Sequence, residues 1–133
     1  MLSKRKQFTL EISQFIHAAH QLPDSDDLIT KECSNLHGHT YLVKTRFSSP
    51  KNKRNGMVVD FKGIKQIVNI LDHQFINQVF EDNDFNEPST AENIARFLCI
   101  KISEQYPDLR DLVILVCEGY KGPDNSSFAV YAS

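Results

Sequence analysis

The sequence predicts an α+β domain in which helices cover one face of an antiparallel sheet. Two observations predict this class: segments near both ends of the chain carry strand-like apolar patterns, and two segments between them place apolar residues at helical spacing. The expected order is β-β-α-α-β-β, with a four-stranded antiparallel sheet and two helices on one face. No internal repeat or linker rich in proline and glycine divides residues 1–133, so we expect a single domain.

The first two strands are predicted from alternation of apolar and polar residues. Phe8, Leu10 and Ile12 alternate with polar neighbours, which indicates a half-buried strand. A polar loop is expected over residues 21–35. Alternation then resumes and places six side chains on one face of a second strand: His37, His39, Tyr41, Val43, Thr45 and Phe47.

Two helices are predicted from apolar residues three and four positions apart. The first contains Phe61, Ile64, Ile67, Val68 and Leu71. The second opens near Pro88, where Ser89 is the expected cap and Glu92 the residue that reaches back to it. Its expected buried stripe is Ala91, Ile94, Ala95, Leu98 and Ile102, and Pro107 ends it.

The last two strands are predicted from apolar content. The run Leu112 to Cys117 predicts a fully buried strand, and Phe128 to Tyr131 predicts the fourth. An open four-stranded sheet has two edges to cover, so assembly into an oligomer is expected.

Composition excludes several classes of protein. The chain has 133 residues, of which 41% are hydrophobic and 24% charged, and its formal net charge is -2, which disfavours a dedicated binder of nucleic acid or of anionic membranes. The longest apolar run is far shorter than the roughly 20 residues of a membrane span. No secretory signal is visible, and three cysteines form no scaffold pattern, so we expect reduced thiols and a cytoplasmic location.

Histidines in the first half of the chain suggest a metal site. His37 and His39 lie two apart on a strand, hence on one face, and His20 can add a third imidazole if the two strands pair. Three imidazoles with one open position describe a catalytic zinc site. The alternative, that these histidines serve no metal, stays open. We expect His17 to point elsewhere.

Other residues near the histidines in sequence can carry chemistry. Cys33 is either a fourth zinc ligand or a thiolate that acts as base or nucleophile. Asp72 and His73 form a carboxylate–imidazole pair suited to acid–base catalysis, although an Asp at a helix end is often a cap. Glu118 follows a buried strand, where its carboxylate either accepts from the 2-amino and ring N–H groups of a pterin or guanine, or simply begins a turn.

Taken in order, these residues resemble the family of 6-pyruvoyl-tetrahydropterin and 6-carboxy-tetrahydropterin synthases. The resemblance covers nearly the whole chain. Its matching pieces are Phe15–His20, Cys33–His39, Gly56–Phe61, Leu71–His73, Ser89–Asn93 and Glu118. It implies a tunnelling fold (T-fold), a homohexamer of two stacked trimers, and active sites between subunits.

The resemblance also implies a role for each site residue, with 7,8-dihydroneopterin triphosphate as substrate. His20, His37 and His39 would bind zinc, which holds the side-chain hydroxyls of the substrate. Cys33 would be the base, with Asp72 and His73 as its relay partners. The pterin ring would be anchored by Glu118, helped by Thr90 and Glu92.

Two departures from the family pattern bear on substrate fit. Gln21 replaces a common Arg, and Gly119 replaces a common Thr.

The three-residue gap between Cys33 and His37 resembles the bacterial type, which forms 6-carboxy-5,6,7,8-tetrahydropterin, acetaldehyde and triphosphate on the route to queuosine or another deazapurine. The alternative is a 6-pyruvoyl-tetrahydropterin synthase, which stops after eliminating triphosphate. A third hypothesis is a zinc-stabilised scaffold without turnover, in which Cys33 is the fourth ligand.

Overall fold

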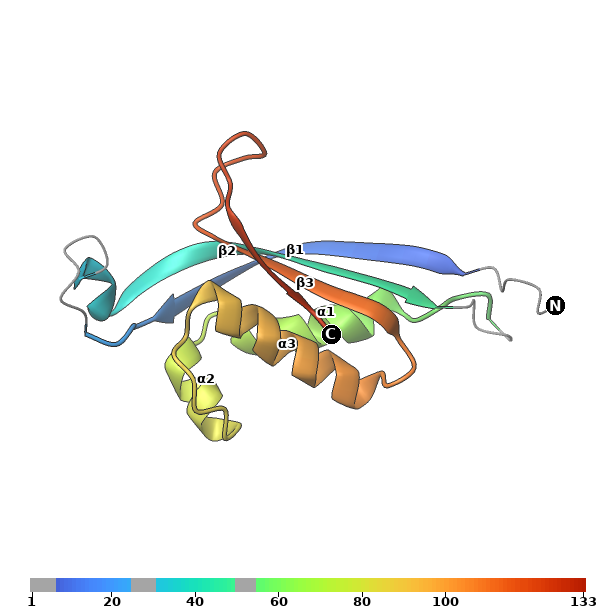
Figure 1. Cartoon of the computed structure of the whole chain (residues 1–133), viewed down its shortest axis with the longest axis horizontal. Coiled ribbons are helices and arrows are strands. Elements are labelled where there is room, and N and C mark those ends of the chain that lie inside the picture. The colour runs from blue at the N-terminus through green and yellow to red at the C-terminus, as the bar shows by residue number, and fades with distance from the viewer. Residues whose placement is uncertain (1–6, 25–30, 50–54) are drawn as a thin grey trace.

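A four-stranded antiparallel sheet with helices against one face forms the framework of the chain (Figure 1). The structure is a computed structural model that describes residues 7–24, 31–49 and 55–133, so part of the expected polar loop, residues 25–30, lies outside it. The elements are β1 (Phe8–His20), η1 (Lys31–Ser34), β2 (His37–Ser49), α1 (Phe61–Val68), η2 (Asn69–Leu71), α2 (Ile76–Asp82), α3 (Ala91–Gln105), β3 (Arg110–Glu118) and β4 (Phe128–Ala132), where η1 and η2 are short 3₁₀ turns.

The strands pair in sequence order, β1-β2-β3-β4, and every pair is antiparallel. The first strand runs further than alternation alone predicted, and its last residue, His20, lies opposite His37. On the next ladder Tyr41 lies opposite Glu118. This register brings three strand ends together at one corner of the sheet.

The core lies between the sheet and the helices. Strand residues that point toward the helices are buried, among them Ile12, Ile16, Tyr41, Val43, Phe47, Ile114 and Val116. They pack with the apolar stripes of α1 and α3, which include Ile64, Val68, Ile94, Leu98 and Ile102. The predicted α+β class, with helices on one face of an antiparallel sheet, is confirmed.

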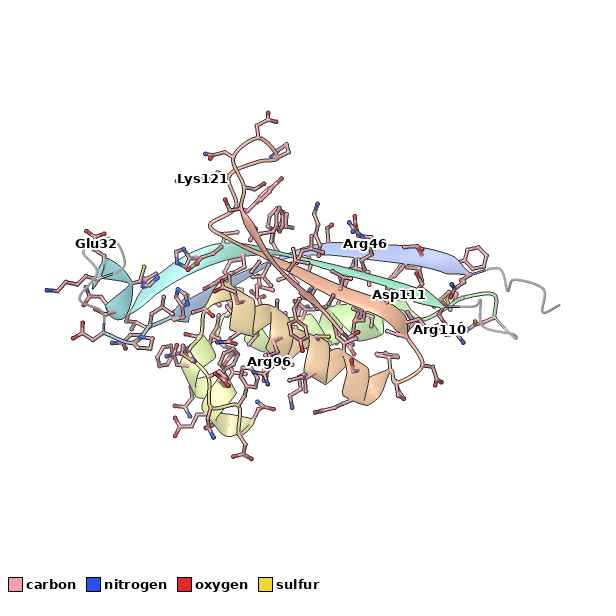
Figure 2. The ribbon with its side chains drawn as sticks, in the orientation of Figure 1. Glu32, Arg46, Arg96, Arg110, Asp111 and Lys121 are labelled. Atoms are coloured by element: carbon pink, nitrogen blue, oxygen red, sulfur yellow. The ribbon has the colours of Figure 1, made fainter. Side chains whose placement is uncertain are left out.

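The other face of the sheet carries charged side chains and a projecting hairpin. Arg46 points away from the helices (Figure 2), and its guanidinium pairs with the Glu11 carboxylate at 2.7 Å. Lys121 lies on the hairpin between β3 and β4, which rises from the sheet on the side opposite the helices (Figure 2). None of the helices in the described part of the chain is long and apolar enough to cross a membrane.

Two local expectations were wrong. Thr90, not Ser89, caps α3: its hydroxyl accepts from the backbone N–H of Asn93 at 3.2 Å. Glu92 is therefore the second helical residue, where a carboxylate favours the helix dipole but does not complete a capping box. The second error is a missed helix, α2, whose seven residues are too few for a clear periodic pattern.

Residues between η2 and α2 cover the outer edge of β1 at its C-terminal end. The backbone N–H of His73 donates to the carbonyl of His17 at 2.6 Å. The backbone N–H of Ala19 donates to the carbonyl of Gln74 at 3.0 Å. Ala19 also forms a parallel bridge with Phe75. These bonds satisfy polar groups that an edge strand would otherwise expose, and they fix the position of Asp72 and His73.

Gly63 on α1 makes the packing of Tyr106 possible, because a Cβ at position 63 would collide with the Tyr106 hydroxyl. We expect Gly63→Ala to lower the free energy of unfolding by about 1 kcal/mol, the overpacking cost outweighing the better helix propensity of alanine. Chemical denaturation checks this. In a Tyr106→Phe background the same substitution should cost less, and an equal cost in both backgrounds would contradict the steric explanation.

Candidate metal centre and its surroundings

Four side chains from three strands converge at the corner of the sheet where β1 ends and β2 begins. They are His20, His37, His39 and Glu118, and one potential ligand atom from each lies within 4.8 Å of the others. The β1–β2 register explains the convergence: His20 is opposite His37, and the alternation of β2 returns His39 to the same face. The prediction that pairing of the first two strands unites the three histidines is confirmed as geometry.

Hydrogen bonds to carbonyl groups orient two of the imidazoles. Nδ1 of His20 lies 2.7 Å from the carbonyl oxygen of Ser89, and Nδ1 of His37 lies 2.7 Å from that of Asn35. A carbonyl oxygen can only accept, so each Nδ1 carries a hydrogen and each neutral ring presents the lone pair of its Nε2. These two Nε2 atoms are 2.9 Å apart. Two lone pairs this close repel each other unless a proton or a metal cation lies between them.

The remaining two members complete a set of donors around the same point. Oε1 of Glu118 lies 2.9 Å from Nε2 of His20 and 2.7 Å from Nε2 of His39. The His39 contact is short but lacks hydrogen-bond geometry, and the buried Nε2 has no hydrogen-bond partner among the described residues. A buried nitrogen without a partner, aimed at other donors, fits a bound cation. Imidazole nitrogens and a carboxylate are ligands that Zn²⁺ takes.

Burial and interactions within the group shift the pKa values of His20, His39 and Glu118. A hydrogen bond from His20 holds the pKa of Glu118 below its usual value, although burial opposes the shift. Burial alone would lower the pKa of His20, but its hydrogen bonds to Glu118 and to the Ser89 carbonyl outweigh burial and raise it. Burial lowers the pKa of His39. Without a metal, the group therefore favours one charged pair, His20 with Glu118.

Tyr41 forms the floor of the group. Its side chain is fully buried, and the edges of the His20 and His39 rings approach it with centroid distances of 6.0 and 5.6 Å. Burial raises the pKa of the Tyr41 hydroxyl, which keeps it neutral. Tyr41 is therefore uncharged, and Glu118 is the acidic member of the group of four side chains that could hold a cation.

Cys33 lies outside this group, on the η1 turn, and is half-buried. The fourth side chain among the histidines is Glu118 rather than Cys33. Two hydrogen bonds tie the turn to the residues after β1: Leu22 N–H donates to the Cys33 carbonyl at 2.9 Å, and the Gln21 amide donates to the Ser34 carbonyl at 2.8 Å. Gln21, which replaces the common Arg, thus helps to hold the Cys33 turn. The role of Cys33 as base stays a prediction.

Asp72 and His73 contact each other, as their predicted pairing requires. Oδ2 of Asp72 lies 3.0 Å from Nδ1 of His73, and its Oδ1 accepts from the backbone N–H of His17 at 2.8 Å. That backbone hydrogen bond, more than the imidazole, lowers the pKa of Asp72. The Asp72 carboxylate is therefore charged and fixed, and it orients an exposed imidazole.

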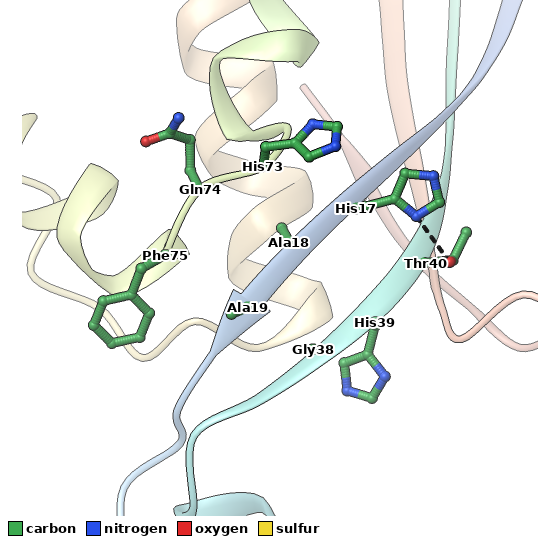
Figure 3. A pocket seen from close by; sticks show the side chains of 9 residues that line it. All are labelled: His17, Ala18, Ala19, Gly38, His39, Thr40, His73, Gln74 and Phe75. Carbon is green, nitrogen blue, oxygen red and sulfur yellow. Dashed lines mark hydrogen bonds between the residues drawn. The ribbon is translucent and has the colours of Figure 1, made fainter.

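His73, but not Asp72, lines an open pocket of about 660 Å³, and Figure 3 shows its lining. His17 hydrogen-bonds with Thr40 across the β1–β2 ladder at 3.0 Å, and its ring faces that of His73 at a centroid distance of 6.0 Å. His39 points away from Thr40 (Figure 3). The expectation that His17 points away from the metal group is confirmed. His17 and Thr40 thus lie on the opposite face of the ladder from the imidazoles of the metal group, whereas His39 belongs to that group and also lines the pocket.

Thr90 and Glu92, predicted to help bind the pterin, lie at the start of α3. This segment contacts the metal group through a backbone carbonyl. The Thr90 hydroxyl caps the helix, and Glu92 is exposed. Their neighbour Ser89 supplies the carbonyl that orients His20. Sequence reasoning missed Ser89 in this role, as it missed Asn35, because a main-chain carbonyl leaves no side-chain signature. Roles for Thr90 and Glu92 in substrate binding stay predictions.

Removing the charge of Glu118 should lower the pKa of His20 in metal-free protein. In Glu118→Gln the carboxylate no longer counteracts the lowering of the His20 pKa by burial. His20 should therefore protonate only at lower pH than in the wild type. A titration of the histidine ring resonances by NMR measures this. Glu87→Gln, which alters an exposed pair with Arg96, is the matched control and should leave His20 unchanged. Equal His20 titration in Glu118→Gln and the wild type would contradict the assignment.

Comparisons with known proteins agree with this geometry. A family model described as 6-pyruvoyl tetrahydropterin synthase matches residues 9–124. A putative 6-carboxy-5,6,7,8-tetrahydropterin synthase of Archaeoglobus fulgidus is 32% identical over 109 residues, covering 79% of this chain and 84% of the relative. A 6-pyruvoyl tetrahydrobiopterin synthase of Drosophila melanogaster is 31% identical over 120 residues, covering 81% of this chain and 68% of the relative.

A solved structure extends the likeness to the whole fold. The Caenorhabditis elegans 6-pyruvoyl tetrahydropterin synthase superimposes with a TM-score of 0.67 at 23% identity and covers 99% of each chain. At that identity the match shows the fold. The family model spans most of the chain and the relatives share about a third of their residues with it, so the predicted resemblance and the expected pterin-synthase type of enzyme are confirmed. The chain belongs to the 6-pyruvoyl tetrahydropterin synthase family.

Proposed function

We propose that the chain is a zinc-dependent lyase that converts 7,8-dihydroneopterin triphosphate and water to 6-carboxy-5,6,7,8-tetrahydropterin, acetaldehyde and triphosphate. The observation that carries the proposal is the convergence of three imidazoles and a carboxylate on one point, with two Nε2 lone pairs 2.9 Å apart. Relatives named 6-carboxy-5,6,7,8-tetrahydropterin synthase support this product. The relative in Drosophila supports the alternative, a 6-pyruvoyl product. We place the reaction in the cytoplasm, on the route to queuosine or another deazapurine.

The three histidines would hold the zinc ion, and bound zinc would supply Lewis-acid polarisation of the substrate's side-chain oxygens. The carbonyls of Ser89 and Asn35 keep His20 and His37 in the tautomer that presents Nε2. Cys33 is the proposed base that removes the C–H proton acidified by this polarisation.

Glu118 is the proposed anchor of the pterin ring. With zinc held by the three histidines, the Glu118 carboxylate would be left to accept from the 2-amino and ring N–H groups of the pterin. The turn after it is held firmly, because the N–H groups of Gly119 and Tyr120 both donate to the Thr40 carbonyl. The backbone at Gly119 has a φ of 69°, a conformation that favours glycine over the common Thr. Thr90 and Glu92 are proposed to assist.

Asp72 and His73 are proposed to relay the proton taken by Cys33. Because this pair lies on the opposite face of the β1–β2 ladder from the metal group of its own chain, we propose that a neighbouring copy supplies it. The proposed assembly is a homohexamer of two stacked trimers, with active sites between copies. Asp72 fixes the His73 ring through Nδ1, which leaves Nε2 to exchange the proton.

Product analysis tests the reaction. Zinc-loaded protein is incubated with 7,8-dihydroneopterin triphosphate, and the pterins are identified by mass spectrometry. We expect 6-carboxy-5,6,7,8-tetrahydropterin together with acetaldehyde, and loss of turnover on metal removal that added Zn²⁺ reverses. A stable 6-pyruvoyl product would establish the alternative. A folded, zinc-loaded oligomer that leaves the substrate unchanged would contradict both.

Cys33→Ala separates the enzyme from a zinc-stabilised scaffold. We expect turnover to fall by at least about 100-fold, the usual contribution of a general base, while zinc content stays that of the wild type. Elemental analysis and a turnover assay on the same sample measure both. Cys99→Ala removes a different thiol, on α3, and is the control that should keep turnover. Loss of zinc from Cys33→Ala would favour the scaffold, whose metal needs the thiolate.

A further inference from the structure

The metal-binding side chain of His20 stands at the end of its strand. His20 is the last residue of β1, so the β1–β2 ladder holds the backbone up to His20 but not the backbone that follows it. The ring is fully buried, and its Nδ1 is held by the carbonyl of Ser89, a residue 69 positions further along the chain, just before α3. The orientation of this imidazole therefore depends on how firmly Ser89 and the residue after His20 are held.

The side chain of Asn77 holds both Ser89 and Gln21, the residue after His20. The Oδ1 atom of Asn77, on α2, accepts from the backbone N–H of Gln21 at 3.0 Å and from the hydroxyl of Ser89 at 2.7 Å. Its Nδ2 donates to the carbonyl of Gln21 at 2.7 Å. The amide thus pairs with both backbone groups of the residue that follows His20, and with the residue whose carbonyl orients the ring.

We propose that Asn77 is a positioning residue for the metal ligand His20. It joins the end of β1, the short helix α2 and the start of α3 through three hydrogen bonds, and so sets the direction in which Nε2 of His20 points. The inference rests on the proposed metal centre. It assigns to α2, the helix that periodicity did not predict, a role in metal binding.

The chemistry of the amide suits this position. Gln21 offers one donor and one acceptor, and Ser89 adds a second donor, so a single group must both accept twice and donate once. An aspartate has the same shape but cannot donate to the Gln21 carbonyl. An alanine leaves the backbone groups of Gln21 and the buried hydroxyl of Ser89 without this partner. Partners that orient metal-binding histidines commonly change metal affinity by 10–100-fold when removed.

The experiment measures zinc affinity in Asn77→Ala and Ser89→Ala by competition with a chelator, and the absorption spectrum of each protein loaded with Co²⁺. We expect zinc to bind about 10–100-fold more weakly in Asn77→Ala, with an altered Co²⁺ spectrum, and a smaller shift in the same direction in Ser89→Ala. Asn83→Ala is the matched control. Asn83 follows α2, and its amide donates only to the Val79 carbonyl of the same helix.

The outcomes separate this inference from the proposed function. If the wild type binds no zinc, both the metal centre and the role of Asn77 are wrong. If the wild type binds zinc and folded Asn77→Ala binds it as tightly as Asn83→Ala, with the same Co²⁺ spectrum, only the role of Asn77 is wrong. A purely structural role would lower the unfolding temperature of metal-free protein without changing these readouts. Should Asn77→Ala fail to fold, Ser89→Ala, which lacks a single oxygen atom, decides by the same criteria.

Discussion

The antiparallel register between β1 and β2 is the constraint on which the rest of the site depends. It places His20 opposite His37 and leaves His39 two residues further on the same face. Because side chains alternate with a period of two, a slip of one residue would send the imidazoles of one strand to the opposite face and dissolve the group. The buried stripe of the same strands opposes such a slip, since Ile16, Tyr41 and Val43 would leave the core with it. Burial of the core and convergence of the candidate metal ligands thus require the same register.

Around this register, the parts of the site are held by main-chain groups more than by side chains. Carbonyls of Ser89 and Asn35 orient two imidazoles, and backbone bonds of His17 fix Asp72 and His73 along the edge of β1. Asn35 and Ser89 lie outside the helices and strands, just before β2 and α3, so the starts of these two elements hold the carbonyls that orient the imidazoles.

Sequence reasoning succeeded where one element alone determines the result. Alternation in β2 predicted the shared face of His37 and His39. Helical spacing predicted most of the buried residues of α1 and α3, although Phe61 at the start of α1 is exposed. It failed where contacts cross between elements. The helix α2 is short, and the bond from His20 to Ser89 joins residues 69 positions apart through a carbonyl, which every residue possesses. Ser89 was read as a helix cap because its local sequence permits that, whereas the tertiary structure uses Thr90.

The two faces of the β1–β2 ladder divide the proposed chemistry between them. The metal group lies on the face that the helices cover, where His20 is buried, His37 and His39 are half-buried and Glu118 is exposed. Asp72 and His73 lie at the other face, where the imidazole is exposed and can exchange protons. The exposed ring of His73 stands beside His17, on the opposite face of the β1–β2 ladder from the imidazoles of the metal group. A neighbouring copy that presents its His73 to this group would therefore complete the proposed site.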